Sequence, residues 1–206
     1  VRAGMVGAGM RVVDSYGAAH KGSLLSLLET HLGAIKDEGS REELQAADRQ
    51  REGLVLMLGA LARHMEPGDP KVLSIVDTLV ATLRTPSAAV QRAVASCISP
   101  LMPAVQGEAA RLVDGMMAQL TQSESFADRM GAAYGLAGMI GGLGLKGVKE
   151  HNIIARLQEA AEDAKNDGGR EGALLGVEQL CNALGRFFEP YVANLLPVLL
   201  RAFSDP

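Results

Sequence analysis

The chain has 206 residues, of which 48% are hydrophobic and only 3% aromatic, and its formal net charge is −4. This length and hydrophobic content exclude a wholly disordered chain, and the scarcity of aromatic rings argues against a β-sandwich. The small negative charge excludes an overall electrostatic attraction to nucleic acid or to an anionic membrane.

The first predicted element is an apolar helix that starts at Arg2 and ends at Gly17, because glycine readily adopts the left-handed conformation of a helix C-terminus. A second helix is expected at residues 21–36. The polar stretch 37–48 follows and is the longest polar connector of the chain. We expect it to be an inserted loop or an extra helical turn.

From residue 51 onward, two kinds of predicted helix alternate. Helices of the first kind begin at Arg51, Gln91, Arg129 and Arg170. Helices of the second kind cover residues 70–83, 107–121, 149–165 and 190–203. Pro70 and Pro190 suit a first helical turn, where the missing N–H costs little. Pro100, Pro103 and Pro197 lie inside predicted helices and should bend them.

The helices that begin at residues 2, 51, 91, 129 and 170 are copies of one segment, with Gly or Ala two positions after the first residue. They recur about every 40 residues, which is typical of HEAT and armadillo repeats. The sequence therefore predicts an all-α HEAT-repeat solenoid, a right-handed superhelix of about five antiparallel helix pairs without a sheet. Residues 1–206 are expected to form one continuous segment inside a longer chain, because the terminal helices lack polar caps.

Both cysteines, Cys97 and Cys181, lie within apolar helical patterns far apart in the chain. This spacing does not indicate a disulfide framework, and it favours a reducing compartment such as the cytoplasm. Cys181 shares the apolar face of the last copy with Leu180 and Leu184, so we expect it to be buried. The longest uncharged run, 130–145, is too short for a membrane span of about 20 residues.

The search for chemistry finds one formal nucleotide motif, G-x-G-x-x-G at residues 142–147. A dinucleotide site requires this motif after a strand, whereas here it follows a helix, so we interpret it as a helix end. No two of the four histidines have metal-ligand spacing. Glu159, Glu162 and Asp163 are interpreted as a solvated helix face. We therefore expect no enzyme activity, cofactor, metal or small-molecule substrate.

The arginines that recur at the start of the copies leave two interpretations open. Each could bind an acid or a carbonyl of the neighbouring turn, or together they could form a basic edge that meets a partner. The candidate partner contacts lie on the predicted turns and are Arg129, Lys146, Lys149, Lys165, Arg170 and Arg186.

Several longer strings carry a family resemblance, at residues 69–72, 94–97, 128–138, 170–174 and 184–192. They resemble the central region of the large general-control translational activators, which are ribosome-associated HEAT-repeat proteins. The similarity extends over essentially the whole chain. This central region is in turn similar to the HEAT domain of the third fungal elongation factor.

The resemblance implies a non-catalytic scaffold for translational control. Such a scaffold would bind ribosomes, through protein and rRNA, and an ABC-class ATPase. It would help to activate the kinase that phosphorylates initiation factor two α during amino-acid starvation, with the kinase bound elsewhere in the full-length protein. The turn 165–170 departs from the family because it keeps only Lys165 and Arg170 as basic residues, which argues against a strong phosphate contact there.

Two other classes remain open at this stage. The solenoid could belong to another scaffold, such as a ribosome-binding elongation factor, a nuclear transport receptor or a tubulin-binding array. The last usually presents tryptophan, which this chain lacks. The chain could also accompany a fused ATPase, which a Walker sequence in flanking regions would reveal.

Overall fold

The computed structural model describes residues 2–36, 38–66 and 68–202. In this part of the chain all regular elements are helical, as the sequence predicts, and there is no strand. The helices are α1 (Arg2–Gly33), α2 (Arg41–Ala62), α3 (Pro70–Thr82), α4 (Ala88–Ile98), η1 (Ser99–Glu108), α5 (Ala109–Gln122), α6 (Phe126–Glu150), α7 (Ile153–Glu162), α8 (Asp167–Leu184), η2 (Gly185–Phe188) and α9 (Glu189–Ala202).

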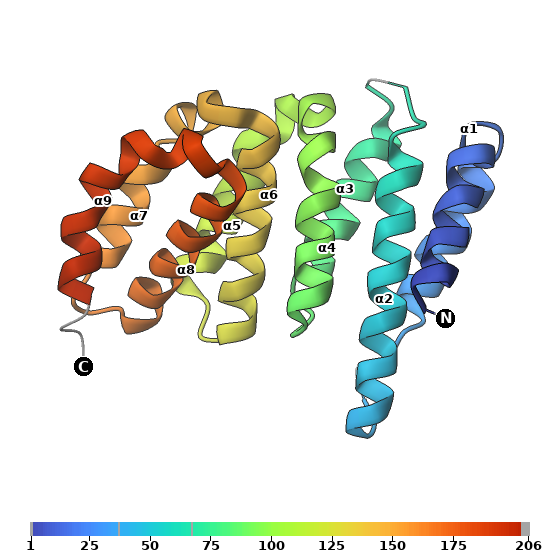
Figure 1. Cartoon of the computed structure of the whole chain (residues 1–206), viewed down its shortest axis with the longest axis horizontal. Coiled ribbons are helices and arrows are strands. Elements are labelled where there is room, and N and C mark those ends of the chain that lie inside the picture. The colour runs from blue at the N-terminus through green and yellow to red at the C-terminus, as the bar shows by residue number, and fades with distance from the viewer. Residues whose placement is uncertain (1, 37, 67, 203–206) are drawn as a thin grey trace.

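The helices form two layers along the array (Figure 1). The helices α2, α4, α6 and α8 pack in succession, and we call them the first layer. The helices α3, α5 and α7 lie behind them (Figure 1), and α9 packs against α7 at the end of the array; we call these four helices the second layer. Aliphatic side chains and methionines fill the space between the layers, as expected for a sequence with few aromatic residues. The largest fully buried ones are Leu58, Leu61, Ile75, Leu79, Leu83, Ile98, Met102, Leu120, Leu136, Met139, Ile140 and Ile153.

Glycines allow the first-layer helices to approach their neighbours backbone to backbone. A Cβ atom on Gly131 would overlap the carbonyl oxygen of Leu83, and one on Gly172 would overlap that of Leu120. Gly138 is similar, because its Cβ would lie 2.6 Å from the carbonyl oxygen of Ala95. The small residues of the repeated segment are therefore required at Gly131 and Gly172, where no side chain fits.

Two of the three predicted glycine helix ends are confirmed. Gly144 has φ 67° and breaks α6, and Gly185 has φ 53° and ends α8. The prediction for Gly17 is wrong, because α1 continues past it and breaks at His20 instead, with φ −122° and ψ 23°. Gly17 is instead needed for its small size, since a Cβ atom added there would lie 2.8 Å from the imidazole of His64.

The prolines act largely as their positions predict. Pro70 occupies the first turn of α3, where Asp69 caps the helix by accepting a hydrogen bond of 2.9 Å from the Lys71 amide. The α-helix α4 stops at Ile98, and the segment with the two following prolines is the 3₁₀ helix η1. By contrast, α9 continues as one helix through Pro197.

The polar stretch before residue 51 is mainly an extension of α2, the second of the two predicted options. Ser40 and Glu43 form a capping box, in which the Glu43 carboxylate accepts from the Ser40 amide at 2.7 Å and the Ser40 hydroxyl accepts from the Glu43 amide at 3.3 Å. The Ser40 amide lowers the pKa of Glu43, and the Ser40 hydroxyl adds to this effect. As a result α2 projects beyond its neighbours at one end (Figure 1).

The two cysteines differ in burial. Cys97 is buried, and its thiol donates to the Val55 carbonyl at 3.6 Å. The prediction that Cys181 is buried is wrong, because it is exposed on a shallow apolar groove between α8 and α9. Helical periodicity identifies an apolar face but cannot show whether another helix covers it. Among the described helices, none is long and apolar enough to cross a membrane.

A thiol reagent is expected to modify Cys181 quickly and to leave Cys97 intact in the native chain. Burial raises the pKa of the Cys97 thiol above its ordinary value of 9.0, which lowers its thiolate fraction further at about pH 8. A colorimetric thiol titration should show one fast thiol per chain and a second only in denaturant. Cys181→Ser should remove the fast phase, and a remaining fast thiol would contradict the burial of Cys97.

Candidate functional site

The recurring Arg and Gln residues bind backbone carbonyls at the ends of second-layer helices. The Gln91 amide donates to the carbonyls of Leu83 and Thr85, at 3.1 and 3.0 Å. Arg129 donates to the carbonyls of Ser123 and Glu124, at 2.9 and 3.0 Å. The last four carbonyls of a helix lack partners within it, so these side chains satisfy groups that would otherwise need water.

The recurring arginine also binds a carbonyl in the last copy of the repeated segment, whereas in the copy that begins at Arg51 it contacts a carboxylate. The Arg170 guanidinium donates to the Asp163 carbonyl at 3.1 Å and to the Asp167 carboxylate at 3.0 Å. Arg51 lies buried and contacts the Asp48 carboxylate at 3.5 Å. These contacts correspond to the first of the two interpretations, in which each arginine binds an acid or a carbonyl near its own turn.

Arg129 also connects two repeats. Its second terminal nitrogen pairs with the Glu171 carboxylate of α8, so one guanidinium joins the turn before α6 to the next first-layer helix. The side chain of Arg129 is only 9% exposed, whereas that of Glu171 is 47% exposed. Sequence analysis predicts the column of arginines, but it does not identify this partner.

The structure separates the other candidate contacts into two groups. Lys146 and Lys149 are exposed in the part of α6 that follows its break at Gly144, and Arg186 is exposed just after the end of α8. Lys146 pairs with Glu150 of its own helix at 3.4 Å. Lys165 and Arg170 flank the start of α8 instead. Since 18 residues of α8 span about 27 Å, the two groups lie at opposite edges of the array (Figure 1).

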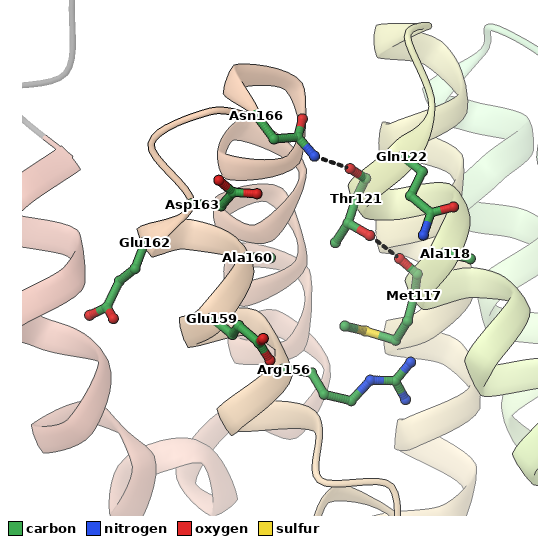
Figure 2. A pocket seen from close by; sticks show the side chains of 10 residues that line it. All are labelled: Met117, Ala118, Thr121, Gln122, Arg156, Glu159, Ala160, Glu162, Asp163 and Asn166. Carbon is green, nitrogen blue, oxygen red and sulfur yellow. Dashed lines mark hydrogen bonds between the residues drawn. The ribbon is translucent and has the colours of Figure 1, made fainter.

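A polar groove of about 600 Å³ lies between α5 and α7 (Figure 2). At one end the Asn166 amide donates to the Thr121 carbonyl at 2.9 Å. At the other, Arg156 extends toward α5 and donates to the Asp114 carboxylate at 2.7 Å. The acidic face predicted from Glu159 and Asp163 forms the α7 wall of this groove. The sequence predicts that wall but does not reveal that α5 lies opposite.

The described residues include no cluster of three or more His, Cys, Asp or Glu side chains that could hold a metal ion. The nucleotide-like motif at 142–147 lies where α6 breaks, and its central Gly144 has the positive φ of a helix end.

Comparison with known proteins finds family models that match two parts of the chain and relatives that match its whole length. The family model of HEAT repeats in the stalled ribosome sensor GCN1 matches residues 1–63, and the EF3 N-terminal HEAT repeat matches residues 129–206. The human protein named stalled ribosome sensor GCN1 is 42% identical over 205 residues. Protein ILITYHIA of Arabidopsis thaliana is 43% identical over 205 residues.

The similarity extends to fungi, since the eIF-2-alpha kinase activator GCN1 of Saccharomyces cerevisiae is 33% identical over 206 residues. Each of these matches covers 100% of the chain but only 7–8% of the relative. No solved structure was found to match. Two repeat-family models and three alignments along the whole chain thus confirm the resemblance seen in the sequence: the chain is similar to a HEAT-repeat segment of the GCN1 proteins.

Proposed function

We propose that this chain is a non-catalytic, cytoplasmic scaffold segment for translational control. It binds ribosomes, an ABC-class ATPase partner, or both, and it helps to activate the kinase that phosphorylates initiation factor two α during amino-acid starvation. The observation that carries the proposal is the 42% identity, along the whole chain, to a protein named stalled ribosome sensor. A second supporting observation is that relatives from Dictyostelium discoideum and yeast are named as activators of the eIF-2-alpha kinase.

The structure suits such a role because stacked helices present long edges of exposed turns. We propose that residues 1–206 act as one continuous run of HEAT repeats, which contacts ribosomal protein and rRNA through Lys146, Lys149 and Arg186 at one edge. Lys165 provides a further contact at the opposite edge. Arg129 and Arg170, which bind carbonyls, orient the turns on which these contacts lie.

Reversing the charge of Lys146, Lys149 and Arg186 is expected to weaken co-sedimentation of the chain with ribosomes by roughly tenfold, about 1.4 kcal/mol. These residues are exposed, so far-UV circular dichroism and the thermal midpoint should stay unchanged. Reversal of the exposed Lys71 and Arg92, which lie on α3 and α4, is the matched control and should leave binding intact. Equal loss in both variants, or none in either, would contradict the assignment of this edge.

The match of residues 129–206 to the EF3 N-terminal HEAT repeat favours a second candidate, a ribosome-binding scaffold of elongation-factor type. The two candidates differ in where the ATPase lies. A Walker sequence in the same polypeptide would favour the elongation-factor type, whereas capture of a separate ABC-class ATPase by this chain would favour the scaffold that activates the kinase.

A further inference from the structure

Three arginines of the second layer each reach back to an acid on the preceding second-layer helix. Arg111 of α5 pairs with Asp77 of α3 at 3.0 Å. The other two bridges repeat this step along the array, Arg156 of α7 to Asp114 of α5 at 2.7 Å, and Arg201 of α9 to Glu162 of α7. We call these three bridges the arginine ladder. Figure 2 shows two of its members on α7, with Arg156 directed toward α5 and Glu162 directed away from it.

The ladder differs from the contacts that join the first layer. There, Gly138 of α6 lies against the backbone of Ala95 of α4, and Gly59 of α2 lies against Cys97 of α4, so steric contact fixes the spacing. In the second layer the groove lies between α5 and α7, and the exposed pair of Arg156 and Asp114 spans that interval. The side chains of Arg111 and Asp77 are likewise about half exposed.

Exposed ion pairs contribute about 0–1 kcal/mol each, so the ladder adds little to the free energy of unfolding. They are also screened by salt, because the Debye length falls from about 10 Å at 0.1 M to about 3 Å at 1 M. A weak bridge can still select among helix spacings of similar energy. Close contacts at Gly131 and Gly172 also hold the C-terminal ends of α3 and α5 against α6 and α8. The rest of each second-layer helix is the part whose spacing can change.

We propose that the arginine ladder sets the spacing of the second-layer helices, so that rising ionic strength widens this layer while the first layer keeps its packing. The interval between α7 and α9 has an added neutral bond, in which the Gln158 amide donates to the Asn194 carbonyl at 2.8 Å. The effect is therefore largest from α3 to α7, where the bridges of Arg111 and Arg156 act.

The test is a distance measurement by pulsed electron paramagnetic resonance. Spin labels are placed at Ser74→Cys on α3 and Ala155→Cys on α7, both exposed positions, in a Cys181→Ser background. The mean distance should lengthen by on the order of 3 Å between about 0.05 M and about 1 M NaCl, because each bridge can admit a water between its partners.

The double variant Arg111→Gln with Arg156→Gln should show the long distance already at low salt and no further change. Lys146→Gln is the matched control, because it removes an exposed pair within α6 that joins no two helices, and it should respond to salt as the unmodified chain does. A salt-independent distance in the unmodified chain, or an unaltered salt response in the double variant, would overturn the proposal. If the double variant does not fold, each single variant should show part of the change, and its absence from both counts equally against the ladder.

Discussion

Gly172→Ala is expected to lower the free energy of unfolding by about 2 kcal/mol, although alanine is normally the better helix former. In an exposed helix interior this substitution stabilises by about 1 kcal/mol. At Gly172 the added Cβ would overlap the carbonyl oxygen of Leu120 and lie 3.3 Å from Cδ of Arg129. Overpacking costs about 1–3 kcal/mol and more when the obstructing atom cannot rotate away, as with a backbone carbonyl.

The chain provides a matched control for this substitution. Gly115 lies inside α5, is exposed, and has no atom within 4 Å of where its Cβ would be. Gly115→Ala should therefore stabilise the chain by about 0.5–1 kcal/mol. Urea unfolding followed by far-UV circular dichroism gives both values. If the two substitutions change stability by the same sign and amount, close backbone packing at Gly172 does not hold α8 against α5.

The glycines also show which structural roles can be predicted from the sequence and which cannot. The repeat register identifies the column that contains Gly131 and Gly172, and helical periodicity places both on a packed face. The register cannot distinguish a glycine needed for its φ from one needed for its size. Gly144 and Gly17 occupy the same position of the repeat, yet the first has φ 67° and the second contacts His64.

Contacts between repeats are the part that a single sequence conceals. The acid that Arg129 binds is 42 residues away, and the same separation joins Arg156 to Asp114. Finding such pairs requires the register of two helices and the direction of each side chain. A repeat period gives the register of the helices approximately, but it does not give the direction of each side chain. For the same reason the acidic face of α7 could be predicted, while the groove that it lines could not.

Arg129→Ala should destabilise the chain by about 2–3 kcal/mol, the second large effect expected. Hydrogen bonds to a charged group contribute about 1.5–3 kcal/mol, and buried carbonyls left without donors add a desolvation cost. Breaking a fully buried ion pair costs about 3–5 kcal/mol. Arg129 stays below that range because Glu171 is half exposed, so water can solvate its carboxylate after the substitution.

A more conservative substitution separates the two roles of this side chain. Gln91 binds carbonyls after α3 with an amide alone, so Arg129→Gln should keep part of the donation to Ser123 and Glu124 while losing the ion pair with Glu171. We expect it to recover about half of the lost stability. Arg186→Ala, at an exposed position, is the control and should change stability by less than about 0.5 kcal/mol.

A double-mutant cycle between Arg129 and Glu171 then measures whether this ion pair couples the stability of adjacent repeats. If the pair couples α6 to α8, Arg129→Ala and Glu171→Ala should be non-additive by about 0.5–1 kcal/mol, which is typical of contacting residues. Thermal unfolding of the four proteins provides the cycle. Additive effects would mean that Arg129 acts only within its own turn, and the coupling of adjacent repeats would then depend on their apolar and glycine contacts.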